Sequence, residues 1–143
     1  MIIAIPQLNY KAGDIQGNSE KIISAIQKAQ NQKAELILFP ELAVSGALPQ
    51  DLLEREEFVN ACRMAVEKIA ATCTQIAAIV GAPNLDSENG IMYNSAYFIQ
   101  HGEVVDGVHK NILSDYDIFS ESRYFIAGED NTPIRYKNQN IRI

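Results

Sequence analysis

Cysteine and positive charge are scarce in this sequence, and each shortage excludes a class of protein. Only two cysteines are present, Cys62 and Cys73, and they form no Cys-x-x-Cys pair. The sequence therefore has neither a disulfide framework nor a zinc site. Twelve Lys and Arg face 18 Asp and Glu, which gives a net charge of −6. Because Lys and Arg do not cluster on one segment, the electrostatic footprint of a nucleic-acid-binding protein is missing.

Long hydrophobic runs are also missing. No stretch approaches the roughly 18 uncharged apolar residues of a membrane span, and residues 1–5 lack the basic region and cleavage site of a signal peptide. We therefore expect a cytoplasmic protein without a membrane partner. An apolar content of 47% in 143 residues is enough for the core of one domain, or of part of one.

The hydrophobic pattern predicts alternating strands and helices. The first helix is expected to start after a cap at Asn18, and the second, which contains both cysteines, after a cap at Asp51. The irregular segment 111–131 carries no clear periodicity. The apolar runs predict strands at residues 1–8, buried on both faces, and at 35–39, 75–81, 92–100, 103–109, 133–136 and 140–143.

This order of elements predicts an α/β fold in which two helices cover at least one face of a sheet. The last predicted strand is still running at Ile143. A strand that stops there leaves backbone groups unpaired, so we expect the chain to be a fragment of a longer domain.

Glu41 is the first candidate for chemistry. It follows a buried strand and Pro40 directly, and the carboxyl ends of strands are where α/β sheets build their sites. Glu41 is either a general base or a solvated loop carboxylate. Lys110 follows another predicted strand. By itself, a lysine at this position indicates only that the chain leaves the strand and enters solvent.

The segment that contains Tyr116, Glu121 and Arg123 interleaves aromatic and charged side chains without a period. Such a mixture favours a structured, functional loop. An ordinary packed loop with an Arg123–Glu121 surface pair is the alternative. The sequence has no glycine-rich phosphate-binding motif.

Three ordered motifs carry a family resemblance: LILFPELAVSG at 36–46, YNSAYFI at 93–99 and HKNILSDYDIFSESRYFIAG at 109–128. Together with QLNYKAGDIQGN at 7–18, they resemble the nitrilase or carbon-nitrogen hydrolase superfamily. Within it, the chain is most similar to the glutamine-hydrolysing domain of glutamine-dependent NAD synthetases. The resemblance implies that residues 1–143 form the N-terminal half of a nitrilase-like αββα sandwich.

The family uses a glutamate, a lysine and a cysteine together. The resemblance assigns the glutamate to Glu41 in F-P-E and the lysine to Lys110 in H-K, with Glu121 as a second carboxylate near the lysine. It also places Tyr116 in the glutamine pocket. The family's cysteine follows the next strand, beyond Ile143, and the helical Cys62 and Cys73 do not replace it. Ala47 stands where the synthetases often have a tyrosine of the glutamine pocket.

The chemistry implied is hydrolysis of glutamine or another small amide. A carboxylate takes the thiol proton, the thiolate attacks the amide, and the ammonium stabilises the oxyanion. Two carboxylates would keep Lys110 charged, and burial would adjust Glu41 for proton transfer. No cofactor enters these steps, whereas ATP and magnesium are implied for a separate synthetase domain. We also expect homo-oligomers, because half a sandwich exposes apolar surface.

Three alternatives remain open. One is a free-standing amidase or nitrilase, and another is the catalytic domain of apolipoprotein N-acyltransferase, which shares the Glu, Lys and Cys plan. The third is a scaffold that keeps the fold without the nucleophile. We expect the 143 residues alone to be inactive.

Overall fold

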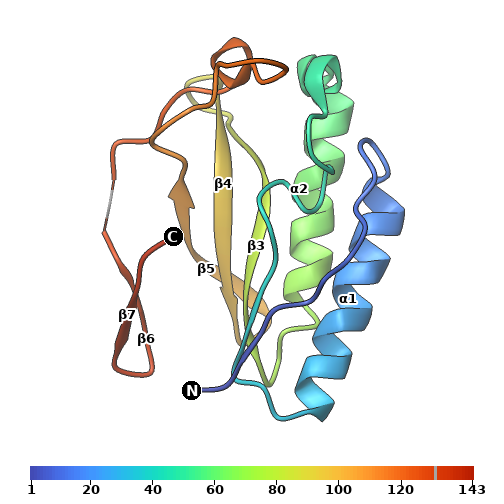
Figure 1. Cartoon of the computed structure of the whole chain (residues 1–143), viewed down its shortest axis with the longest axis vertical. Coiled ribbons are helices and arrows are strands. Elements are labelled where there is room, and N and C mark those ends of the chain that lie inside the picture. Colours follow the sequence, from blue (N-terminus) through green and yellow to red (C-terminus); the bar gives the residue numbers. More distant parts are fainter. Residues whose placement is uncertain (131) are drawn as a thin grey trace.

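The computed structural model describes residues 1–130 and 132–143 of the chain (Figure 1). Its main sheet has the strand order β1-β2-β3-β4-β5; the first three strands are parallel, and β3, β4 and β5 pair antiparallel. The predicted α/β fold is confirmed. The strands are β1 (Ile3–Ala4), β2 (Leu36–Leu38), β3 (Ala77–Asp86), β4 (Ile91–Gln100) and β5 (Glu103–His109).

Two helices, α1 (Ile15–Asn31) and α2 (Glu56–Ala70), lie side by side over one face of this sheet (Figure 1). Their apolar stripes are buried as the spacing predicts, and they form one core with the helix-facing side chains of β2 and β3. The stripes consist of Ile22, Ile26 and Ala29 on α1, and of Val59, Cys62, Val66 and Ile69 on α2.

Both predicted helix caps are wrong. Asp14 caps α1 by accepting a hydrogen bond from Gly17 N, whereas Asn18 is fully buried inside the helix. Asp51 belongs to a short 3₁₀ helix, η1 (Gln50–Glu54), and α2 begins only at Glu56. Cys73 lies beyond the end of α2, although it is as buried as predicted.

The strand predictions are wrong in two places, at the edge strand β1 and at the end of the central strand β3. Only two of residues 1–8 form β1, because Pro6 has no N–H to donate to a ladder. Ile3 and Ile5 are exposed rather than buried. In contrast, β3 continues through residues 84–86, predicted as loop, because they pair with the start of β4. His101 and Gly102 turn β4 into β5 with positive φ.

The second face of the sheet carries a small hairpin of β6 (Ile134–Tyr136) and β7 (Gln139–Ile141). Ile134 and Tyr136 pack on Phe98 and its neighbours in β2 and β3. The chain therefore forms one sheet with helices on one side and a hairpin on the other (Figure 1).

The segment predicted as irregular, 111–131, contains only the short 3₁₀ helix η2 (Glu121–Arg123) within 111–130, and residue 131 lies outside the described residues. Among the described residues, no helix is both long and apolar enough to cross a bilayer.

Candidate functional site

Glu41 stands in the loop that follows β2, and this loop lies directly on β3. Phe39 N donates to the carbonyl oxygen of Ile79, and Val44 N donates to that of Gly81. At Gly81 an added Cβ would come within 2.8 Å of the Glu41 Cα. The missing side chain of Gly81 therefore allows the loop to hold Glu41 against the sheet.

Lys110 follows β5 and is fixed from two sides. Its N–H donates to the carbonyl oxygen of Asn94 on β4 (2.8 Å), and its own carbonyl oxygen accepts from Gly128 N (2.9 Å). Asn94, in turn, is buried near the middle of β4. Lys110, at the end of β5, and Asn94, within the neighbouring β4, therefore both lie beside the loop that carries Glu41.

Glu121 begins η2 and is buried, with 9% of the residue exposed. Its N–H donates to the carbonyl oxygen of Ser114, which closes the loop between them. Next to it in space, Leu42, Leu53 and Phe125 form a small buried apolar cluster. Because Leu42 follows Glu41 and Phe125 lies four residues after Glu121, this cluster draws the two glutamate-bearing loops together.

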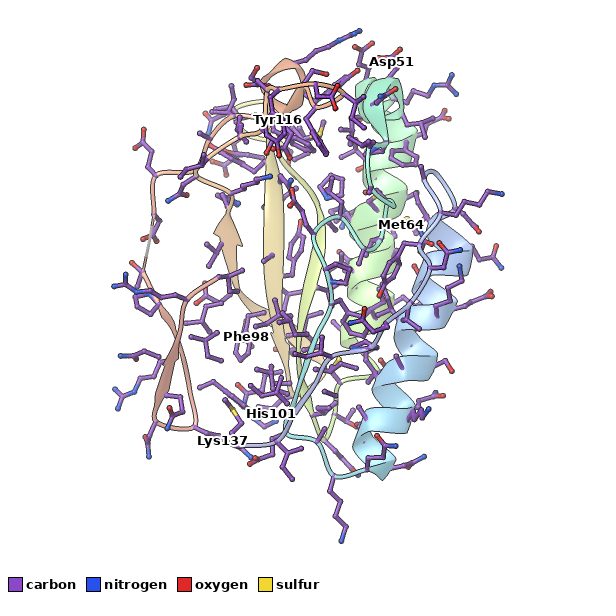
Figure 2. The ribbon with its side chains drawn as sticks, viewed as in Figure 1. Asp51, Met64, Phe98, His101, Tyr116 and Lys137 are labelled. Carbon is purple, nitrogen blue, oxygen red and sulfur yellow. The ribbon has the colours of Figure 1, made fainter. Side chains whose placement is uncertain are left out.

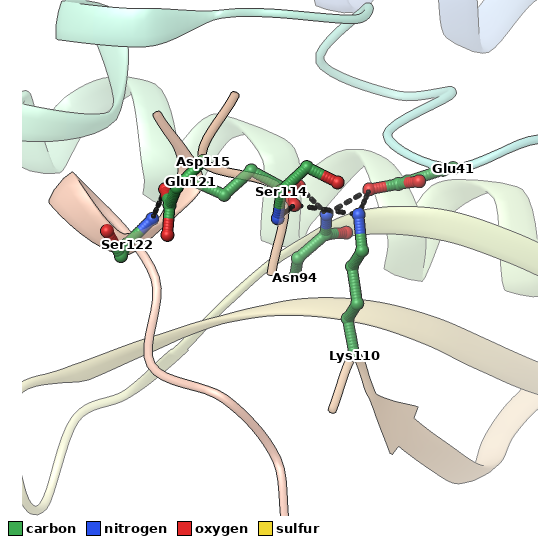
Figure 3. Close-up of polar contacts among 7 residues, drawn as sticks. All are labelled: Glu41, Asn94, Lys110, Ser114, Asp115, Glu121 and Ser122. Carbon is green, nitrogen blue, oxygen red and sulfur yellow. Dashed lines mark hydrogen bonds and ion pairs between the residues drawn. The ribbon is translucent and has the colours of Figure 1, made fainter. Parts of the chain in front are cut away.

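The three charged side chains converge (Figure 3), as the resemblance predicts. Lys110 Nζ donates to Glu41 Oε1 at 2.8 Å and to Glu121 Oε2 at 2.7 Å, although 69 and 11 residues separate these pairs in the sequence. Asn94 Nδ2 donates to Glu41 Oε1 and also to Glu121 Oε1. Ser114 N adds a further bond to Glu121 Oε2, at 2.6 Å.

The electrostatics of the cluster favour an ammonium between two carboxylates. Burial alone works against the charge on Lys110, but its hydrogen bonds to Glu121 and Glu41 outweigh burial and raise its pKa. Burial likewise opposes the charge on Glu121, but bonds from Lys110, Ser114 N and Asn94 outweigh it and lower the pKa of that carboxyl. Lys110 and Glu121 are therefore held in their charged forms.

A cavity of about 430 Å³ opens beside this cluster and is lined mainly by apolar side chains. Phe39 and Ile143 are among its apolar lining residues. Its polar lining residues are Glu41, Asn94, Ser95, His109, Lys110 and Asn111. The Glu41 side chain is 51% exposed, against 26% for Lys110 and 11% for Glu121. The expected burial of Glu41 is therefore wrong for these 143 residues.

Tyr116 does not join the cluster. It lies in the loop at one end of β4 (Figure 2), it is 67% exposed, and its ring contacts that of Phe119. It is not among the residues that line the cavity. The alternative pair of Arg123 with Glu121 is wrong, since Arg123 pairs with Asp51 and Glu54 of η1.

Sequence reasoning missed Asn94 and the Ser114 N–H as parts of the site. The signal for Asn94 is a polar side chain within the otherwise apolar and aromatic segment YNSAYFI. The Ser114 N–H could not be predicted in this way, because every residue except proline has a backbone N–H. His109, stacked on Tyr93 with ring centroids 4.1 Å apart and bonded through Nδ1 to Ser95 Oγ, fixes the strand end beside Lys110.

Neither cysteine has the character of a nucleophile. Both are fully buried, and burial raises the pKa of Cys62 to about 12 and that of Cys73 to about 11. Thiols at such pKa values hold almost no thiolate at neutral pH. Within the described residues, no three His, Cys, Asp or Glu side chains are grouped as ligands for a metal ion.

Comparison with known proteins finds relatives that match almost the whole of this chain. The chain is 35% identical over 142 residues to a glutamine-dependent NAD(+) synthetase of Xylella fastidiosa, covering 99% of this chain and 26% of the relative. The chain thus spans about a quarter of such relatives. The structure of a glutamine-dependent NAD+ synthetase from Acinetobacter baumannii matches with a TM-score of 0.91 and 31% identity, over 98% of this chain and 26% of that one.

A second kind of solved structure also matches. An amidase from Nesterenkonia sp. AN1, in which acrylamide has added to the active-site cysteine, is 26% identical with a TM-score of 0.81. This match covers 98% of the present chain and 55% of the amidase. Residues 2–137 match the family model described as carbon-nitrogen hydrolase, and the chain therefore belongs to the carbon-nitrogen hydrolase family.

Proposed function

We propose that this chain supplies the base and the oxyanion-stabilising lysine of a glutamine amide hydrolase. The observation that carries the proposal is the Lys110 ammonium held between Glu41 and Glu121 at a cavity of small-molecule size. The curated relatives are glutamine-dependent synthetases, which supports glutamine as the amide.

In the proposed mechanism, Glu41 takes the proton of a cysteine thiol, and the thiolate attacks the amide carbon. The new C–S bond places negative charge on the amide oxygen, which the Lys110 ammonium stabilises. The C–N bond then breaks, and the proton held by Glu41 leaves with ammonia. Glu41 then takes a proton from water, whose oxygen attacks the thioester carbon. The C–S bond breaks, glutamate leaves, and the proton on Glu41 returns to the cysteine thiolate.

The mechanism takes its cysteine from outside the 143 residues, because Cys62 and Cys73 are both buried in the apolar core between the helices and the sheet. Ile143 lines the same cavity as Lys110, so residues that follow it in a longer protein start beside the site. ATP and magnesium would serve a further synthetase domain, where ammonia is used, and no step above involves them.

The experiment compares the 143-residue chain with the protein extended by the sequence that follows Ile143 in its gene. Ammonia released from glutamine is expected from the extended protein only. Glu41→Gln, Lys110→Ala and replacement of the cysteine should each lower turnover by at least ~10²–10³-fold. A double variant should be scarcely worse than either single one, because the groups act as a unit. Arg63→Ala, which breaks an exposed ion pair with Glu67 on α2, is the control.

Hydrolysis by the short chain that disappears in Lys110→Ala would contradict the proposal and indicate another nucleophile. A free-standing amidase is the second candidate, favoured by the Nesterenkonia structure. The amidase and the synthetase are distinguished by testing the extended protein for NAD formation from added ammonium salt. A synthetase retains this activity in all the variants above, whereas an amidase never shows it.

A further inference from the structure

Asn94 is the one neutral side chain among the charged groups of the cluster. The residue is 3% exposed, and its Nδ2 donates to Oε1 of Glu41 and to Oε1 of Glu121 (Figure 3). An amide nitrogen carries two hydrogens, so each carboxylate receives one. The opposite amide orientation would turn the carbonyl oxygen towards two carboxylate oxygens and is excluded by repulsion.

The hydrogen bonds divide unequally between the two carboxylates. Both oxygens of Glu121 are occupied, Oε1 by Asn94 and Oε2 by Lys110 and Ser114 N. In Glu41, by contrast, both donors use Oε1. No donor to Oε2 of Glu41 is found among the residues that the structure describes. Only Glu41 therefore presents a carboxylate oxygen that is open to a proton.

We infer that Asn94 is a positioning residue, which, with Lys110, fixes Oε1 of Glu41 and leaves Oε2 to receive the proton of the nucleophile. The same amide saturates Glu121 and keeps it as an anionic partner of the lysine. Asn94 thus decides which of two neighbouring glutamates is the base. This inference rests on the proposed function.

The position of Asn94 makes this role physically reasonable. It stands on β4, between β3, against which the Glu41 loop packs, and β5, which ends before Lys110. A group on a central strand is held more precisely than one on a loop. Displacing a reacting group by about 1 Å can cost about 10²-fold in rate, so losing this tether should affect turnover more than substrate binding.

The first test uses the 143-residue chain and needs no activity. In Asn94→Ala, the Glu121 carboxyl, followed by ¹³C NMR, is expected to titrate at higher pH than in the parent because one donor to its anionic form is lost. Asn89→Ala is the matched control, since Asn89 donates to Asp86 in an exposed turn. It should leave the Glu121 titration unchanged. An unchanged titration in Asn94→Ala would overturn the inference.

The second test uses the extended protein and Asn94→Asp, which keeps the side-chain shape but replaces the donor by a third carboxylate. Turnover should fall about 10–100-fold with little change in KM, and the acidic limb of the pH profile should move to higher pH. Asn89→Asp, which also faces a carboxylate, should match the parent. A loss of activity with an unmoved pH profile would show a merely structural role and would overturn the inference.

The two tests separate this inference from the proposed function. If the extended protein does not hydrolyse glutamine while the NMR titration responds to Asn94→Ala, the proposed function fails and the tethering of the carboxylates stands. If hydrolysis is found and both Asn94 variants behave like the parent, the inference alone fails.

Discussion

At the scale of single residues, the charged cluster combines attraction between the lysine and two glutamates with repulsion between the glutamates. Two carboxylates, Glu41 and Glu121, share one ammonium, so the cluster keeps a net negative charge that the amide of Asn94 helps to offset. Glu121 is the more buried carboxylate and the one with more donors. Its ionisation should therefore contribute to folding stability.

This contribution should depend on pH. The pKa of Glu121 lies below its ordinary value of 4.5 in the folded chain. Its stabilising effect is therefore complete above about pH 4.5 and disappears as the pH falls through the folded pKa. In Glu121→Gln, the free energy of unfolding should fall by about 1–2 kcal/mol at pH 7, with a smaller deficit in acid. Urea unfolding of both proteins from pH 3 to 7 measures this difference in the free energy of unfolding. A deficit that is equal at both ends would contradict the prediction.

At the scale of elements, the contact of a loop with a strand places the base. Pro40, Glu41 and Leu42 lie on Gly81 of β3, where a Cβ would stand 2.5 Å from the Pro40 carbonyl oxygen. Leu42 has φ of 51°, in the left-handed region that costs a non-glycine residue energy. The packing on β3 and the apolar cluster around Phe125 hold the loop in this conformation.

Gly81→Ala should therefore displace the loop. We expect a loss of about 1–3 kcal/mol in the free energy of unfolding, as for other overpacked sites, together with a weaker contact between Glu41 and Lys110. Gly107→Ala on β5 is the matched control, since its Cβ would meet only Ala96 O at 3.7 Å. Urea unfolding and NMR shifts of the Lys110 Nζ group are the measurements. Equal effects of the two substitutions would contradict this account.

At the scale of the whole molecule, one edge of the sheet is apolar and exposed. β1 is one of the two edge strands. Ile3 in this strand and Ile5 just after it are 46% and 63% exposed. An apolar edge strand with unpaired backbone groups is a template for further pairing. Met64, on the outer side of α2 (Figure 2), is 62% exposed but stands away from this edge.

We predict that the 143-residue chain self-associates through the β1 edge. Ile5→Lys should lower the average mass measured by light scattering at high concentration, because a charge on the edge opposes pairing. Met64→Lys adds the same charge elsewhere and should leave the mass unchanged. A parent chain that stays monomeric across a wide concentration range would contradict this prediction.

Local sequence patterns determined the helices and strands whose side chains follow a regular spacing. The 3.6-residue spacing predicts α1 and α2, and the apolar runs predict β2 and β4, because burial of one face or of a whole run leaves a periodic trace. The strand β5 is also confirmed, although most of its residues are exposed. The motif F-P-E also placed Glu41 at a strand end, and the ordered motifs allowed the convergence of Glu41, Lys110 and Glu121 to be predicted. Confirmation came from the 2.8 and 2.7 Å contacts of Lys110.

Only the tertiary structure decided the remaining features, since they depend on partners distant in sequence. Asn18 has the composition of a helix cap, yet its side chain is buried and bonds to Lys11 and to the carbonyl oxygen of Val44. Asn94 joins two carboxylates from different loops. No local rule distinguishes such an asparagine from one in a turn, because the bonds that satisfy its amide form only when the strands and loops have come together.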